Sequence, residues 1–243
     1  MIPALRRWLR RAPLNRLFEP YARALNDHWA RGRPVFFHIG SGRFFTLASS
    51  NQGFEPLERY RTLEEHALAS CRGRVLDAGA GAGRHSILLH DAGLEVVSLE
   101  IEPTLVDLMK RRGLSQVHQG DVWDFEHGQF DTILFLHHTI GLAGNLDGLS
   151  ELLRRLRARL TPRGQILLDS SVPRRTRSSQ RYAGEVEMQL QYRALLGRPF
   201  PWLVVDFDVL NERAKFAGFQ AELVTRGRDP RDYLARLTPD PSA

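Results

Sequence analysis

The sequence predicts an α/β domain whose central parallel sheet is covered by helices on both faces. From Arg74 onward, short apolar segments that suit strands alternate with segments of helical periodicity, as in consecutive β–α units. The first of these strands runs directly into a glycine-rich turn, and an acidic residue ends or closely follows each of the next two strands. Together these observations indicate a ligand crevice at the carboxyl edge of the sheet.

Composition and charge exclude several classes of protein. The 243 residues, 42% apolar and 26% charged, suffice for one α/β domain with an appendage. The net charge of +6 resides in residues 1–34, so the remainder lacks the basic surface that favours nucleic-acid binding. Cys71 is the only cysteine, which excludes an internal disulfide and favours a reducing cytoplasm. No apolar run approaches the roughly 20 residues of a membrane span, and the amino terminus does not fit a secretory signal.

Residues 1–65 are predicted to form an amino-terminal cap. A helix begins at Pro20, whose ring suits a first helical position, and Tyr21, Leu25 and Trp29 share one of its faces. The other predicted elements of the cap are a helix over residues 5–11, a hairpin over 35–47, a loop over 48–56 and a helix over 58–70 that leads into the core.

The α/β alternation after the cap defines a domain over residues 66–243. Its clearest helix carries leucines at 3-4-3-4 spacing from Leu146 to Leu160, with arginines elsewhere around it. The predicted strands cover residues 74–77, 94–99, 115–118, 130–136, 165–170, 220–225 and 232–237, and the helices cover 84–91, 103–112, 146–160 and 209–217.

An inserted hairpin is predicted over residues 182–206. Polar and apolar residues alternate strictly over residues 185–192, which indicates a strand with one solvated face. The segment 202–206 is its expected partner across a loop at 197–201.

The glycine-rich turn after the first strand favours a cofactor without phosphate. A turn that binds a dinucleotide has the pattern Gly-x-Gly-x-x-Gly, but the third position falls on Arg84 when counted from Gly79 and on Ser86 when counted from Gly81. Asp77, at the end of the strand, would repel a pyrophosphate but would suit an ammonium group. Glu100 lies 21 residues after Gly79 and suits the two hydroxyls of a ribose. Asp121 lies 21 residues further on and suits an adenine amine.

These segments resemble the class I S-adenosylmethionine-dependent methyltransferases. Residues 75–83 look like the first motif of that family, 99–103 like the second, 119–122 like the third, and 130–131 with 160–164 like the later landmarks. The resemblance implies a Rossmann-like sheet of seven strands in the order 3-2-1-4-5-7-6, with strand 7 antiparallel. It implies S-adenosylmethionine as cofactor, S-adenosylhomocysteine as product, and a cofactor site formed by Asp77, Gly79, Ala80, Gly81, Gly83, Arg84, Glu100, Ile101, Asp121, Val122 and Leu136.

The methyl acceptor is expected at the end of the fourth strand, where His137 and His138 stand. Either imidazole can take a proton from an acceptor, and packing or hydrogen bonding beneath the cofactor is the alternative role. The Asn/Asp-Pro-Pro-aromatic motif of nucleic-acid amino methyltransferases is absent from this place, and Cys71 precedes the first strand, too far away to act as a nucleophile. Adjacent histidines alone do not indicate a metal, so no metal site is predicted.

Five residues outside the family motifs are candidates for contact with the acceptor: Tyr21, Tyr182, Glu185, Glu187 and Trp202. The two glutamates belong to the solvated face of the inserted hairpin, for which simple exposure is the favoured interpretation. The aromatic residues have packing as their alternative.

The sequence thus predicts a cytoplasmic enzyme that methylates an N, O or S atom of a small molecule, with no membrane partner. An RNA, protein or peptide methyltransferase that docks its substrate through the basic amino-terminal arm is the main alternative. A nucleotide-dependent oxidoreductase and a non-catalytic protein that retains the fold are further alternatives.

Overall fold

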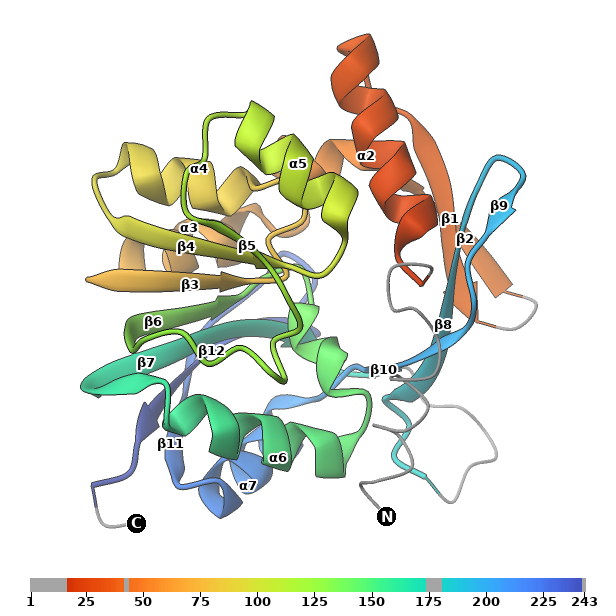
Figure 1. Ribbon diagram of the computed structural model, residues 1–243. Helices are drawn as coiled ribbons and strands as arrows, with labels where there is room; N and C mark the ends of the chain where they lie inside the picture. Colours follow the sequence, from red (N-terminus) through yellow and green to blue (C-terminus); the bar gives the residue numbers. More distant parts are fainter. Residues whose placement is uncertain (1–16, 42–43, 174–180, 242–243) are drawn as a thin grey trace.

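The computed structural model describes residues 17–41, 44–173 and 181–241, which form two sheets with helices around them (Figure 1). The helix predicted over residues 5–11, most of the basic arm and the tip of the first hairpin lie outside the described residues. Within the described residues, no helix is both long and apolar enough to cross a membrane.

The larger sheet has seven strands in the order β11-β12-β7-β6-β3-β4-β5. Strand β12 is antiparallel to both of its neighbours, whereas the pairs among β3 to β7 are parallel. Numbered along this domain, the order is 3-2-1-4-5-7-6, so the predicted topology is confirmed. The strands are β3 (Arg74–Ala78), β4 (Glu95–Glu100), β5 (Val117–Gln119), β6 (Phe130–Phe135), β7 (Leu160–Ser171), β11 (Phe219–Arg226) and β12 (Asp232–Pro239).

Helices cover both faces of this sheet (Figure 1). Apolar residues of α3 and α4 pack on one face, and those of α6 and α7 pack on the other. Helix α5 packs beside β4 and β5 and also contacts α2 of the cap. The helices are α2 (Glu19–Arg31), α3 (Arg61–Ser70), α4 (Arg84–Asp91), α5 (Pro103–Arg111), α6 (Leu146–Arg157) and α7 (Phe207–Phe216), with 3-10 turns η2 (Ser50–Gly53) and η3 (Thr139–Ala143).

Local sequence explains where α6 begins, and the sheet explains where it ends. The Asn145 side chain accepts a hydrogen bond from the backbone N of Gly148 at 2.7 Å and so caps the helix. Leu149 and Leu153 are fully buried, as the leucine spacing predicts. The prediction that this helix extends to Leu160 is wrong, because Leu160 pairs with Phe130 and begins β7.

The smaller sheet joins the cap to the inserted hairpin. Strands β1 (Phe36–Ser41) and β2 (Phe44–Ser49) form the hairpin predicted in the cap, and β8 (Glu185–Tyr192) covers the predicted residues 185–192. Strand β1 pairs with β8, and β8 also pairs with β9 (Leu195–Leu196) and β10 (Phe200–Leu203). The partner strand thus lies slightly before the predicted segment 202–206.

Candidate active site

A cavity of about 720 Å³ lies between the carboxyl edge of the larger sheet and the smaller sheet. Its size is within the range of about 300–1,000 Å³ that is typical of small-molecule sites. One wall is formed mainly by the turns that follow β3, β4, β5 and β6, and the other mainly by side chains from α2, β1, β2, β8 and β10. Residues of the segment between β2 and α3, such as Arg59 and Tyr60, also line the cavity. Figure 1 shows the two sheets on either side of this region.

The glycine turn brings backbone to the cavity surface. Gly79, Ala80, Gly81 and Ala82 all line the cavity. Gly79 and Gly81 have φ angles of 78° and 60°, a left-handed conformation that glycine adopts without strain. Gly83 does not line the cavity. It precedes α4 with φ of 82°, and a Cβ there would lie 2.8 Å from Met109 Cγ and Leu114 Cδ1.

Asp77 lies behind this turn rather than on the cavity surface. It is almost fully buried, and its Oδ2 accepts a hydrogen bond from Ser86 Oγ at 2.7 Å. Ser98 Oγ donates in turn to Ser86 Oγ at 2.8 Å. In this arrangement the carboxylate ties the end of β3 to α4 and β4 and is not part of the cavity lining.

Glu100 ends β4 and lines the cavity as a buried carboxylate. Its Oε2 accepts from Gly81 N and its Oε1 from Glu102 N, both at 2.9 Å. Burial raises the pKa of Glu100 to about 7, although these backbone hydrogen bonds act in the opposite direction. The site therefore holds a carboxylate that is costly to ionise without a hydrogen-bonding or cationic partner.

The other predicted cofactor residues in the strand ends also face the cavity. Ile101, Asp121, Val122 and Leu136 all line it. Asp121 Oδ1 accepts from Trp123 N at 3.1 Å, which fixes the carboxylate beside the end of β5. The apolar side chains and two carboxylates offer a surface for a flat, polar-edged ring and for hydroxyl groups.

A buried ion pair lies beside the glycine turn. The Arg84 guanidinium donates to both oxygens of Glu64, with N–O distances of 2.6 Å. His137 Nε2 also lies within hydrogen-bond distance of Glu64 Oε1, and His85 Nε2 lies 3.5 Å from the same oxygen. Burial alone would raise the pKa of Glu64, but contacts with His137, His85 and Arg84 outweigh it and hold that pKa far below its usual range.

Three side chains of this cluster are close enough together to hold a metal ion, but the carboxylate among them is paired with an arginine. One ligand-type atom from each of Glu64, His85 and His137 lies within 4.8 Å of the others. Both carboxylate oxygens of Glu64 are nevertheless engaged by Arg84. Arg84 already supplies the counter-charge to Glu64, so the contacts that the structure shows here are those of a buried ion-pair network.

His137 and His138 line the cavity in an uncommon backbone conformation. Their φ angles are 58° and 62°, in the left-handed region that non-glycine residues seldom adopt. The fully buried carboxylate of Asp169, on β7, accepts from both backbone amides, from His137 N at 3.0 Å and from His138 N at 2.6 Å. Asp169 thus stabilises the turn that presents both imidazoles to the cavity.

The two imidazoles differ in their partners. His137 is engaged by Glu64, whereas the buried Nδ1 of His138 has no hydrogen-bond partner among the described residues. The same is true of the adjacent Thr139 Oγ1, and both residues line the cavity. A buried polar atom without a partner costs about 1–3 kcal/mol, and because both atoms are buried, a ligand in the cavity would meet other atoms of these two side chains.

The wall opposite the strand ends includes two of the predicted acceptor residues. Tyr21 lies over the glycine turn, with its hydroxyl 3.6 Å from the position of a Cβ at Gly81. Burial, and secondarily the charge of Glu100, raises the pKa of Tyr21 well above its ordinary value. The Trp202 ring packs so closely on Gly141 that a Cβ there would lie 2.2 Å from it.

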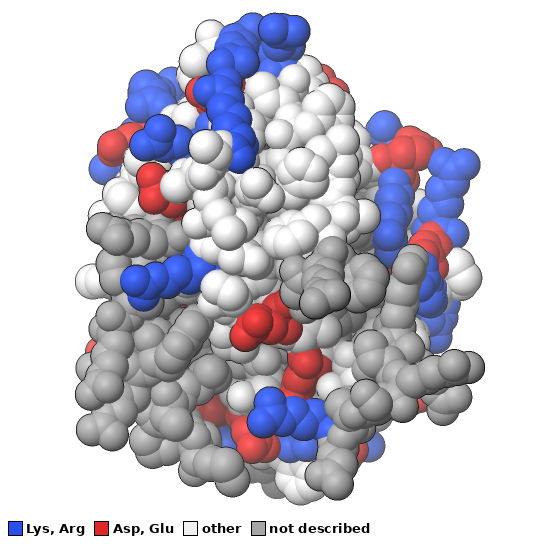
Figure 2. All heavy atoms as spheres, turned by 90° about the vertical axis from the view of Figure 1, so that its right-hand side faces the viewer, with Lys and Arg blue, Asp and Glu red and all other residues white. Residues whose placement is uncertain are grey.

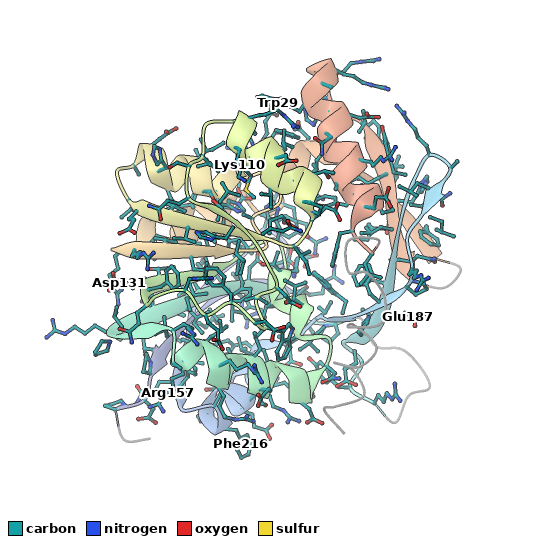
Figure 3. The ribbon with its side chains drawn as sticks, viewed as in Figure 1. Trp29, Lys110, Asp131, Arg157, Glu187 and Phe216 are labelled. Atoms are coloured by element: carbon teal, nitrogen blue, oxygen red, sulfur yellow. The ribbon has the colours of Figure 1, made fainter. Side chains whose placement is uncertain are left out.

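Three other predicted acceptor residues lie outside the cavity lining. The Tyr182 hydroxyl and Asp206 Oδ2 are 2.5 Å apart, and Glu185 Oε1 accepts from Leu146 N at 3.0 Å. Glu187 is exposed on the side of the smaller sheet that faces away from the larger sheet (Figure 3). The apolar face of β8, with Met188 and Leu190, is the one that lines the cavity.

Several residues of the site were missed by sequence reasoning. Glu64 looks like an ordinary acid of an amphipathic helix, and nothing local marks it as a partner of Arg84. Asp169 carried a usable signal, because an acid within the apolar run of β7 requires a buried partner. Phe37 and Phe200 also line the cavity, yet the sequence indicates only a strand residue at Phe37 and a loop residue at Phe200.

Comparison with known proteins relates this fold and turn to one family. A family model described as a methyltransferase domain matches residues 75–164. A SAM-dependent methyltransferase from Bacteroides fragilis, solved in complex with S-adenosyl-L-homocysteine, is 34% identical. It has a TM-score of 0.82, and the match covers 93% of this chain and 96% of that chain.

Other proteins are similar to this chain over only part of their length or in fold alone. The magnesium-protoporphyrin O-methyltransferase of Rhodobacter capsulatus is 37% identical over 79 residues, which are 30% of this chain and 34% of that protein. The chain thus spans about a third of the length of this relative. The sugar N-methyltransferase KedS8 from Streptoalloteichus sp ATCC 53650 shares the fold, with 17% identity and a TM-score of 0.58. The match covers 78% of this chain and 90% of that chain.

Three findings lead to the same assignment: the topology of the larger sheet, the glycine turn, and a relative that is 34% identical along nearly its whole length. The chain belongs to the class I S-adenosylmethionine-dependent methyltransferases.

Proposed function

We propose that this protein binds S-adenosylmethionine in the cavity and transfers its methyl group to a nitrogen, oxygen or sulfur atom of a small molecule. The observation that carries the proposal is the composition of the two walls. Glycine backbone and the carboxylates of Glu100 and Asp121 lie on one wall, and apolar side chains of the smaller sheet lie on the other.

The first wall fits the proposed cofactor. Glu100 suits the ribose hydroxyls, Asp121 suits the adenine amine, and Ile101, Val122 and Leu136 supply apolar contacts for the ring. Two carboxylates would repel a pyrophosphate but stabilise a sulfonium nucleoside. Arg84 and His85 also line this part, and Arg84 is a candidate for the cofactor carboxylate while its bond to Glu64 sets its position.

The second wall fits an acceptor of limited size. When bound, the cofactor supplies an electrophilic methyl group. The residues of this chain would exclude water, hold the acceptor in line and, through His137 or His138, receive a proton. Tyr21 and Trp202 lie on this wall and are proposed to contact the acceptor. Tyr182, Glu185 and Glu187 have no place in this proposal, because they do not line the cavity.

Calorimetry with S-adenosylhomocysteine tests the proposal. We expect binding that Glu100→Ala weakens at least tenfold, whereas Glu95→Ala, at the exposed start of the same strand, leaves it unchanged. A protein that binds neither S-adenosylhomocysteine nor S-adenosylmethionine at millimolar concentration would contradict it. RNA binding that falls steeply with salt and is lost on deletion of residues 1–16 would favour a macromolecular acceptor instead.

A further inference from the structure

The wall formed by the smaller sheet is apolar across three of its strands. Phe37 from β1, Leu190 from β8, and Phe200 and Trp202 from β10 all line the cavity. Phe200 and Trp202 have ring centroids 5.9 Å apart in an edge-to-face arrangement. This wall favours an apolar body, and its rings favour an aromatic one. Figure 2 shows the opposite, outer side of the smaller sheet, where a broad area also lacks acidic and basic side chains.

No carboxylate is available on that wall to bind a cation. Among the described residues that line the cavity, Glu100 and Asp121 are the acids, and both stand at strand ends on the cofactor wall. Residues 1–16, 42–43, 174–180 and 242–243 contain no aspartate or glutamate, so these segments add none. A protonated amine would lose its hydration without gaining a counter-charge.

The arginines at the cavity are also neutralised. Arg59 donates to both oxygens of the buried Asp232, at 2.6 and 2.9 Å. Arg84 is paired in the same way with Glu64. The described cavity lining therefore offers little free charge to an anionic acceptor, and a neutral one fits best.

His138 and Thr139 stand next to each other after the end of β6, and both line the cavity. Thr139 Cγ2 lies 3.3 Å from the position of a Cβ at Gly79, so these residues are next to the glycine turn. The Nδ1 of His138 and the Oγ1 of Thr139 are themselves buried, so a ligand would meet other atoms of the two side chains. The His138 imidazole therefore lies beside the proposed cofactor site, where it can serve as the base for an acceptor hydroxyl.

From these observations we infer that the acceptor is a neutral, largely apolar phenol that is methylated on oxygen, with His138 receiving the phenolic proton. The inference rests on the proposed function and narrows its acceptor class. We assign the role to His138 rather than to His137, whose Nε2 is engaged by Glu64.

The proposed step balances as a displacement. The phenolic oxygen attacks the methyl carbon of the cofactor, a carbon–oxygen bond forms, and the carbon–sulfur bond breaks with its electron pair remaining on sulfur. The proton of the phenol passes to the His138 imidazole and then to water. A phenol, with a pKa near 10 as in tyrosine, is within reach of an imidazole base, whereas an aliphatic alcohol is not.

Binding to the protein saturated with S-adenosylhomocysteine tests the acceptor class. Calorimetric titration at pH 7.5 would compare 2-naphthol with 2-naphthylmethylamine, which has a similar body but a positive charge. We expect the phenol to bind at least tenfold more tightly. Equal or tighter binding of the amine, or no binding of either compound, would overturn the inference.

Two variants test the wall itself. Trp202→Ala should weaken 2-naphthol binding at least tenfold, whereas Trp29→Ala, an exposed tryptophan outside the cavity lining, should leave it unchanged. Met188→Glu would introduce a carboxylate on β8 and should reverse the preference in favour of the amine. Tighter binding of the amine by Met188→Glu can be measured even if Trp202→Ala fails to fold. If Met188→Glu does not bind the amine more tightly, this wall is not the acceptor site.

Single-turnover methylation with S-adenosylmethionine tests the atom and the base. Mass spectrometry should identify the naphthyl methyl ether. His138→Gln should lower the rate at least tenfold and leave a pH profile that follows only ionisation of the phenol. Absence of the ether from the wild-type reaction, or a variant with the wild-type rate and profile, would overturn the inference. Failure of the proposed function is distinguishable, because S-adenosylhomocysteine itself would then not bind.

Discussion

Asp169 holds His138 by its backbone: His138 N donates to Asp169 Oδ1 at 2.6 Å while His138 has a φ of 62°. The other oxygen of the same carboxylate accepts from His137 N. A buried carboxylate thus compensates for two consecutive left-handed residues at the end of β6. The direction of the His138 side chain depends on this pairing.

Replacement of Asp169 should destabilise the protein. Asp169→Asn replaces one carboxylate oxygen with an NH2 group, so one of the two backbone amides faces a donor instead of an acceptor. We expect a loss of about 2–3 kcal/mol in the free energy of unfolding, measured with urea. Asp91→Asn, at the exposed end of α4, should change it by less than about 0.5 kcal/mol. Equal stability of the two variants would show that the turn does not need the carboxylate.

Glu64 should be far more sensitive to substitution than its neighbour. Glu64→Gln leaves the buried Arg84 without a counter-charge and should lower the free energy of unfolding by about 3–5 kcal/mol. Glu65→Gln, on the exposed side of the same helix, is the matched control. Because the penalty comes from the unpaired charge, the double variant Glu64→Met/Arg84→Met should recover much of the loss in thermal unfolding. A double variant no more stable than Glu64→Gln would contradict this cause.

Glu100 should make the protein without cofactor less stable as pH rises. Burial raises its pKa to about 7 in the folded protein, against 4.5 in the unfolded chain. Between these values the folded state binds more protons, so stability falls as pH rises from 4.5 to 7 and stays low above. This difference in the pKa of Glu100 corresponds to a loss of about 3 kcal/mol at most in the free energy of unfolding. Glu100→Gln should therefore raise the melting temperature at pH 8.5 but hardly at pH 4.5.

The same titration should affect cofactor binding in the opposite direction. Ribose hydroxyls need the ionised carboxylate as an acceptor, so S-adenosylhomocysteine affinity should increase as pH rises through 7 and should lose this dependence in Glu100→Gln. Calorimetry at pH 6 and 8.5 measures both. A pH-independent affinity in the wild-type protein would show that Glu100 is already ionised at pH 6.

Two glycines with the same backbone conformation should respond differently to alanine. Gly83 and Gly93 have φ angles of 82° and 85°, but a Cβ at Gly83 meets Met109 and Leu114, whereas nothing lies within 4 Å at Gly93. Gly93→Ala should cost about 1 kcal/mol from backbone strain alone. Gly83→Ala should cost about 1–3 kcal/mol more, through overpacking. Equal melting temperatures would show that the neighbours of Gly83 move aside freely.

The sequence by itself determined the elements whose signals are local. Alternating apolar runs and glycines were enough to predict the strands and helices of this domain, whereas the strand order, which the structure confirms, was what the resemblance to the methyltransferase family implied. Glu100 and Asp121 could be placed at the cavity because the carboxyl ends of those strands share one edge. Asp131, at the opposite end of β6, points away from that edge (Figure 3).

Only the tertiary structure decided which distant residues complete the site. Sequence patterns predict a hairpin over residues 35–47 and a strand over 185–192, but not that the two pair with one another, because antiparallel pairing has no sequence code across such a separation. Glu64 and His137 are 73 residues apart and meet only because α3 packs beside the end of β6. Asp77, Tyr182 and Glu185 have suitable chemistry, yet hydrogen bonds within the fold take each of them away from the cavity. Sequence supplies the functional groups, and long-range packing determines which of them face the ligand.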